Sequence, residues 1–148
     1  MTGVAFQAIN LPTLQLAAWA YPALEVVHII GIALLLGNLV LLEFRVFGKG
    51  QGLPVADLSR LGLSLVAGGF LLAAASGSVM FATQPAELLA NRAFTIKLVL
   101  LFAAGSNAVW FHTRQSLVKL DALAKTQMVV STLIWVGVIA CGRWIAYV

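Results

Sequence analysis

Four long apolar stretches constrain the fold of this chain more than any other feature. They run over residues 21–42, 61–81, 94–111 and 128–147. A helix needs roughly 20 predominantly apolar residues to cross the ~30 Å hydrocarbon layer of a bilayer. Only 9% of the 148 residues are charged, and the mean hydropathy is +1.00. So small a chain cannot bury that much apolar surface within itself, and we expect the lipid bilayer to surround it.

Three short connectors, 43–60, 82–93 and 112–127, join the four stretches. Short connections make neighbouring helices of a bundle antiparallel. The sequence therefore predicts an all-α fold, an integral membrane four-helix up-down bundle that forms a single domain. Residues 1–20 mix apolar and polar side chains around Pro12, and we expect them to lie as a segment along the membrane interface.

Basic residues predict the orientation of the bundle. Connectors 43–60 and 112–127 hold three Lys or Arg residues each, whereas 82–93 holds one and 1–20 holds none. Basic loops stay in the cytoplasm, so both termini are expected on the outer, periplasmic side. The nine basic residues are scattered singly, although nucleic-acid binding requires a cluster; no nucleic-acid partner is expected. The lone Cys141 cannot form an internal disulfide.

Four ionisable residues interrupt the apolar stretches, namely Glu25, His28, Lys97 and Arg143. Each costs a few kcal/mol in hydrocarbon and calls for an explanation. With a rise of about 1.5 Å per residue, His28 lies roughly 10 Å below the outer end of its span and both basic residues roughly 5 Å deep. All four thus belong to the outer half of the membrane. Glu25 and His28 share one helix face, which Gly31 continues.

This arrangement predicts a site for haem b. A histidine nitrogen ligates haem iron, and the missing side chain of Gly31 would leave room for the macrocycle. Lys97 or Arg143 would pair with the propionates, and Glu25 would adjust the local charge. The predicted function is electron transfer between a periplasmic redox protein and a quinone or another membrane subunit, with no catalytic residue assigned.

Two other functions remain open at this stage. Imidazole also suits copper, so His28 with Met80 would serve a copper-handling membrane protein. Alternatively, Glu25 pairs with Lys97 or Arg143 and His28 completes a hydrogen-bond network. The chain would then be a cofactor-free structural or assembly subunit of a larger membrane complex.

His112 is a further candidate metal ligand, at the cytoplasmic end of the third span. In a straight bundle it would differ in height from His28 by about 17 Å. Two axial ligands of one iron place their nitrogens within about 4 Å, because metal–imidazole bonds are near 2 Å. The two histidines therefore cannot share one haem within a chain, and the second axial ligand stays open.

Helix contacts are predicted from small and polar residues. Small side chains let helices approach closely in lipid, and on the second span they recur every four positions, which also favours a homo-oligomer. Asn38 and Asn107 must each find a partner, and we expect them to bond to each other. The small residues are Gly69, Ala73 and Gly77.

Three motifs together resemble a family of small four-span bacterial membrane proteins that carries no assigned activity. They are Tyr21-Pro22-x-x-Glu25-x-x-His28-x-x-Gly31, Asn91-x-x-Phe94-x-x-Lys97 and Gly142-Arg143-Trp144-Ile145-Ala146-Tyr147. The resemblance covers nearly the whole chain. It implies a multi-pass protein of the bacterial inner membrane.

More distantly, the chain is similar to the membrane part of copper-resistance D proteins and to the bacterial membrane protoporphyrinogen oxidase, which binds haem b. His28 and Lys97 are the matching positions, and the likeness implies a haem-linked redox role. The first span lacks the aromatic and arginine-rich pattern of the oxidase, so only the type of site transfers.

Overall fold

The computed structural model describes residues 13–148 and confirms the all-α prediction, since its regular elements are all helical over that range. Four helices are long and apolar enough to cross a membrane. Three short helical elements lie in the connectors and at the C-terminus. The long helices are α1 (Ala20–Val46), α2 (Val55–Thr83), α4 (Arg92–Thr113) and α6 (Ala122–Trp144); the short ones are α3 (Pro85–Ala90), α5 (Ser116–Lys119) and the 3-10 helix η1 (Ile145–Tyr147).

The predicted interfacial segment at residues 1–20 falls mostly outside the described part of the chain, which begins at residue 13. Of that segment, Leu14 is tied to the bundle, because its amide donates to the carbonyl of Ala82 at 2.8 Å. Trp19, directly before α1, is 73% exposed. An exposed indole at a helix end is typical of the membrane–water interface.

All four long helices begin before the predicted spans, and α1, α2 and α4 also end after them, whereas α6 ends at Trp144 and the 3-10 helix η1 completes the predicted fourth span. Their ends have local causes. Gly48 and Gly50 take positive φ angles of 85° and 64° in the loop after α1, a conformation that glycine adopts at little cost. The side chain of Asn91 accepts from two amides at the start of α4, and that of Asp121 caps α6. Such caps satisfy amides that have no partner within the helix.

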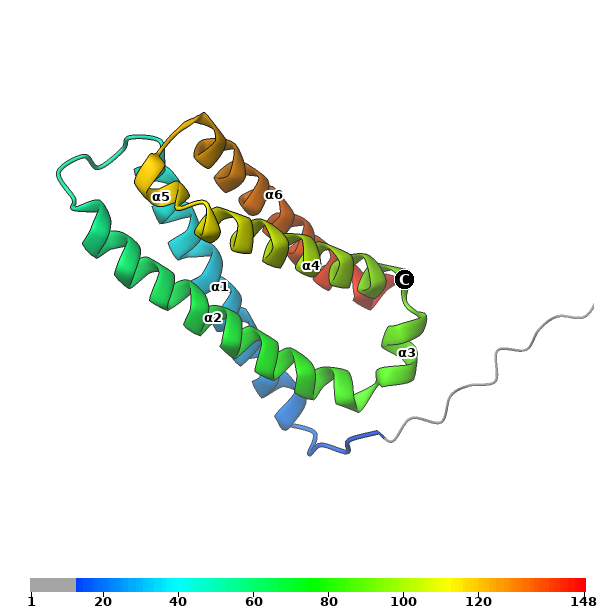
Figure 1. Ribbon diagram of the computed structural model, residues 1–148. Coiled ribbons are helices and arrows are strands. Elements are labelled where there is room, and N and C mark those ends of the chain that lie inside the picture. The colour runs from blue at the N-terminus through cyan, green and yellow to red at the C-terminus, as the bar shows by residue number, and fades with distance from the viewer. Residues whose placement is uncertain (1–12) are drawn as a thin grey trace, which may run out of the picture.

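The helices pack as two antiparallel pairs (Figure 1). Helix α1 lies along α2, and α4 lies along α6. The pairs meet chiefly through α1 and α6, whereas α2 and α4 scarcely touch. In Figure 1, α3 bridges the space between α2 and α4 at the end that also carries the C-terminus, and α5 lies at the opposite end. This is the predicted up-down order.

Two glycines bring the backbones of α1 and α2 into direct contact. A Cβ atom on Gly31 would lie 2.7 Å from the amide nitrogen of Ala73, and one on Gly69 would lie 2.6 Å from the carbonyl of Gly31. Cβ atoms essentially never approach other atoms so closely. The predicted stripe of small residues on the second span therefore is a helix contact, made with α1.

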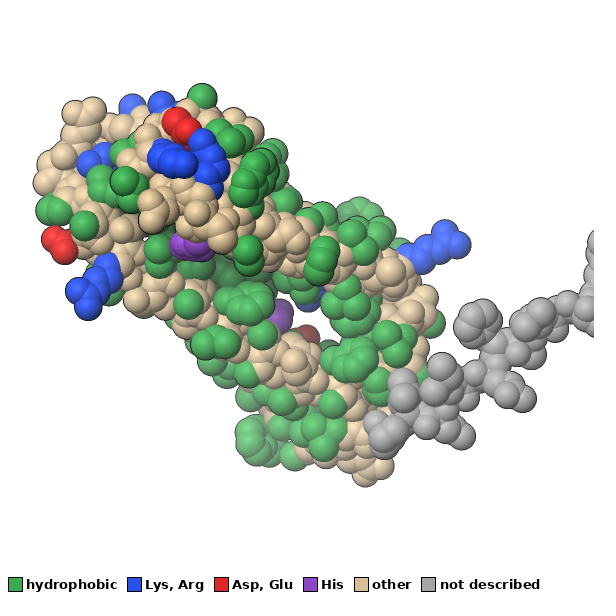
Figure 2. Space-filling view, in the orientation of Figure 1, with side chains coloured by type: hydrophobic (Ala, Val, Ile, Leu, Met, Phe, Trp, Pro, Cys, Tyr) green, Lys and Arg blue, Asp and Glu red, His purple; other side chains and the backbone are tan. Residues whose placement is uncertain are grey.

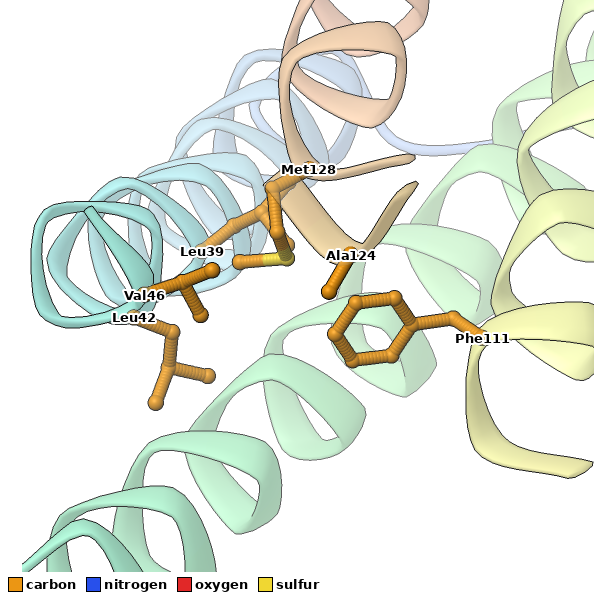
Figure 3. Close-up of a cluster of buried hydrophobic side chains, with 6 residues drawn as sticks. All are labelled: Leu39, Leu42, Val46, Phe111, Ala124 and Met128. Carbon is orange, nitrogen blue, oxygen red and sulfur yellow. The ribbon is translucent and has the colours of Figure 1, made fainter. Parts of the chain in front are cut away.

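The buried core lies toward the end that carries α5. Six buried side chains from α1, α4 and α6 form one cluster (Figure 3). Outside it, large apolar side chains are exposed on every long helix; Leu71, Phe102 and Leu133 are 67%, 80% and 66% exposed. Such exposure favours contact with a lipid bilayer over contact with water. The cluster consists of Leu39, Leu42, Val46, Phe111, Ala124 and Met128.

Candidate functional site

His28 is half-buried on the side of α1 that faces α2. Its Nδ1 lies 2.8 Å from the carbonyl oxygen of Ala73 and 3.1 Å from the hydroxyl of Ser76. A carbonyl can only accept, so Nδ1 carries the proton and donates it. Ser76 in turn donates to the carbonyl of Leu72 at 2.7 Å. Helix α2 thus fixes both the position and the tautomer of the imidazole.

The other ring nitrogen, Nε2, is left as the unprotonated one. Among residues 13–148 no side chain or backbone group forms a hydrogen bond to it. A histidine that ligates a metal almost always donates its second N–H to a carbonyl, a carboxylate or water. His28 meets this requirement through Ala73, so its Nε2 lone pair is available to a ligand.

Lys97 lies in the second turn of α4, in the other helix pair. It is half-buried on α4, where its Nζ lies 3.5 Å from the position that a Cβ on Gly142 would take. Within the described residues, no carboxylate pairs with Lys97. Figure 2 shows a hollow between the helix pairs in which histidine surface is visible.

The other two predicted charges are engaged elsewhere. Arg143 is exposed, donates to the hydroxyl of Tyr147 at 2.8 Å and lies over that ring at 5.2 Å. Glu25 is exposed one turn from His28. Over residues 13–148 the structure contains no ion pair between Glu25 and either Lys97 or Arg143. The pairing that the purely structural alternative invokes is therefore not formed there.

The predicted role of Gly31 is wrong. Gly31 is buried, and backbone atoms of α2 occupy the space where its side chain would be. That space is filled by helix packing and has no room for a macrocycle. The glycine beside the imidazole is instead Gly77, whose Cβ position lies 3.1 Å from Cε1 of His28. The sequence interpretation failed because it considered only the helix that carries His28.

His112 lies in the last turn of α4, near α5, and is exposed. Its ring packs edge-on against Phe111 with centroids 5.8 Å apart. His28 is in the half of α1 nearer the opposite end of the bundle (Figure 1), so the structure does not bring the two histidines together. In the described chain no three His, Cys, Asp or Glu residues form a group that could hold a metal. The copper alternative at His28 and Met80 stays a prediction.

The two asparagines do not bond to each other as predicted. Asn38 donates to the carbonyl of Leu34 in its own helix at 2.7 Å. Asn107 donates to the backbone carbonyl of Gln127 at 3.0 Å and so links α4 to α6. The prediction was wrong because each side-chain amide has a backbone carbonyl within hydrogen-bond distance and donates to it rather than to the other asparagine.

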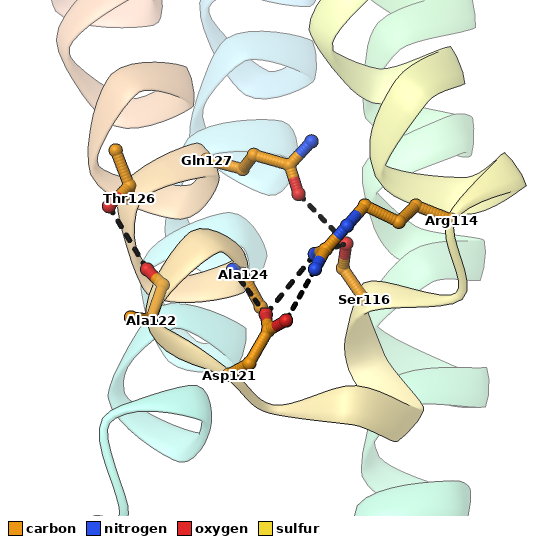
Figure 4. Close-up of polar contacts among 7 residues, drawn as sticks. All are labelled: Arg114, Ser116, Asp121, Ala122, Ala124, Thr126 and Gln127. Carbon is orange, nitrogen blue, oxygen red and sulfur yellow. Dashed lines mark hydrogen bonds and ion pairs between the residues drawn. The ribbon is translucent and has the colours of Figure 1, made fainter.

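Two polar contacts were missed entirely from the sequence. Thr132 of α6 donates to the carboxylate of Glu43, which lies in α1 and not in the predicted connector. At the α5 end, Arg114 forms an ion pair with Asp121 and also donates to Ser116 (Figure 4). Hydrogen bonds from Arg114 and then from the backbone of Ala124 lower the pKa of Asp121 from 3.8 to about 2.

The candidate site therefore consists of His28, which hydrogen-bonds to α2, and Lys97 on α4, which has no carboxylate partner among residues 13–148. The residues that contact His28, Ala73, Ser76 and Gly77, come from α2; Ala73 and Gly77 belong to the predicted small-residue stripe, but the stripe did not indicate that they contact His28. Comparisons of the chain with models of protein families, with curated proteins and with solved structures find no match, so the resemblance based on motifs stays a prediction.

Proposed function

We propose that the protein binds b-type haem in the outer half of the bacterial inner membrane, with Nε2 of His28 as an axial ligand to the iron. One observation carries the proposal: Nδ1 of His28 is committed to the carbonyl of Ala73, which leaves Nε2 as a free lone pair. A histidine that ligates a metal almost always donates its second ring N–H in this way. Haem, when bound, would supply a one-electron carrier.

The residues around His28 have distinct roles in this proposal. Lys97 has no carboxylate partner among the described residues, and a haem propionate would provide one, close to the membrane surface. Glu25, exposed one turn farther out, would adjust the local charge. Arg143 already donates to Tyr147, so Lys97 is the better candidate to pair with a propionate. The partners would be a periplasmic redox protein and a membrane quinone.

An absorption spectrum of the purified protein tests this proposal. The chain is expressed with ample haem, solubilised in detergent and purified, and the Soret and α bands are recorded. We expect both bands in the wild-type protein and their loss in His28→Ala. The matched control is His112→Ala, which removes the only other histidine and should leave the bands unchanged. Lys97→Met should retain the bands but bind haem more weakly.

Two results would overturn the proposal. One is a wild-type protein without pigment after expression with ample haem. The other is a spectrum that is identical in wild type and His28→Ala. A colourless protein that His28→Ala destabilises would instead support the structural subunit, because the hydrogen bond to Ala73 would then serve only to hold α1 against α2.

A further inference from the structure

A cavity of about 470 Å³ lies between the four long helices, closer to α5 than His28 is. Its volume is in the range of small-molecule sites. The lining is mostly apolar and includes the aromatic rings of Phe70, Phe111 and Trp135. It contains no Asp, Glu, Lys or Arg, so the cavity suits a neutral molecule. Helices α2 and α4 both line it and scarcely touch each other, so a lipid-soluble molecule would enter between these two helices.

Gln127 gives this apolar cavity a polar feature. The residue lines the cavity and is only 3% exposed. Its Oε1 accepts from the hydroxyl of Ser116 at 2.8 Å. Within the described chain, its Nε2 has no hydrogen-bond partner. A buried amide N–H without a partner is costly and rare in folded proteins, so this nitrogen calls for an acceptor.

The orientation of the amide is set from outside the cavity. Arg114 can only donate, and it donates to the hydroxyl of Ser116 at 3.3 Å. The hydroxyl of Ser116 donates its own proton to Oε1 of Gln127, so Oε1 lies on the side of Ser116. Figure 4 shows the amide nitrogen of Gln127 turned away from Ser116. Asn107 and His112 line the same cavity and add polar groups near Gln127.

We propose that this cavity is a binding site for a lipid-soluble ring compound with a carbonyl acceptor, of the quinone class. The carbonyl would accept from Nε2 of Gln127, and the ring would pack against Trp135 and Phe70. An apolar tail would leave between α2 and α4 into the lipid. The inference does not rest on haem binding at His28, and it requires no redox step.

The test uses the full chain in lipid nanodiscs, with equilibrium dialysis against two probes. One is menadione, a methylated naphthoquinone; the other is 2-methylnaphthalene, which has the same fused rings without the carbonyls. Empty nanodiscs give the partition baseline. We expect saturable binding of menadione, at least about tenfold tighter than that of 2-methylnaphthalene, as one well-made hydrogen bond in an apolar site allows.

Matched variants locate the site. Ala67 and Ala75 are both exposed alanines of α2, but only Ala67 lines the cavity. Ala67→Leu should weaken menadione binding at least about tenfold by filling space, and Ala75→Leu should leave it unchanged. Gln127→Leu should remove the preference for menadione over 2-methylnaphthalene. Ala67→Leu keeps the test valid should Gln127→Leu fail to fold, because it leaves the polar network intact.

Several outcomes overturn the inference. They are menadione uptake that does not exceed partition into empty nanodiscs, equal affinity for both probes, and wild-type binding by Ala67→Leu. Equal affinity would indicate an apolar cavity in which Gln127 gives no preference for a carbonyl. Menadione binding is measured on protein without haem as well, so a colourless protein that binds menadione would refute the proposed function and leave this site standing.

Discussion

At the scale of single residues, the clearest electrostatic feature is Asp121, which caps α6 and pairs with Arg114. Its carboxylate accepts from the guanidinium and from the amide of Ala124. Both contacts favour the ionised form, which is why the pKa of Asp121 falls from 3.8 to about 2. A group whose pKa is lower in the folded state stabilises the fold above its ordinary pKa. That stabilisation is lost as the pH falls from 3.8 toward 2.

We therefore predict that Asp121→Asn lowers the thermal stability of the protein at pH 7 and that the deficit shrinks between pH 4 and pH 2. Asparagine still caps a helix, so the deficit reports the charge. Asp121→Ala loses the cap as well and should be less stable than Asp121→Asn at every pH. The measurement is detergent-solubilised thermal unfolding by circular dichroism across this pH range. A deficit of Asp121→Asn that stays constant down to pH 2 would contradict the ion-pair account.

At the scale of elements, the contact between α1 and α2 depends on two glycines. An alanine at Gly31 would place a methyl group 2.7 Å from a backbone nitrogen of α2, and backbone cannot move aside as a side chain can. We predict that Gly31→Ala destabilises the protein by about 1–3 kcal/mol, the usual cost of overpacking. Reversible unfolding in mixed micelles, followed by circular dichroism, measures the change.

Gly37 on the same helix supplies the matched control, because a Cβ there would meet nothing within 4 Å. Gly37→Ala should be neutral or stabilise the helix by about 0.5–1 kcal/mol, since alanine restricts the unfolded chain more than glycine does. Equal effects of Gly31→Ala and Gly37→Ala would show that the helices separate at no cost. The close contact would then contribute nothing to stability.

These elements also show what the sequence could predict and what it could not. The four helices were predictable because the length and hydropathy of a span depend only on residues that are adjacent in the sequence. Which helix packs against which could not be predicted, since a helix that is apolar on every side has no polar–apolar pattern that identifies its neighbour. Nothing near Gly31 in the sequence points to Gly69. The same holds for the candidate sites. His28 and Lys97 were predictable because they are polar residues in apolar spans, whereas the contacts of Ala73 and Gln127 form only when the helices pack together.

At the scale of the whole molecule, the connectors alternate between the two ends of the bundle (Figure 1). The loop after α1 and the segment around α5 share one end and hold most of the basic residues outside the spans. The end with α3 holds the C-terminus. Since basic loops remain in the cytoplasm, we expect the α3 end, and with it His28, on the periplasmic side. A periplasmic redox protein could approach the proposed haem at His28 only in this orientation.

Cysteine labelling tests that orientation in a Cys141→Ala background, which removes the only native cysteine. Gly52→Cys reports the loop after α1, and Ala86→Cys reports α3; both positions are exposed. A membrane-impermeant maleimide applied to spheroplasts should label Ala86→Cys alone, and lysis should make Gly52→Cys reactive as well. Labelling of Gly52→Cys in unlysed spheroplasts would place both termini in the cytoplasm. Any haem at His28 would then lie within reach of cytoplasmic electron donors, because the helix pairs hold His28 near the α3 end in either orientation.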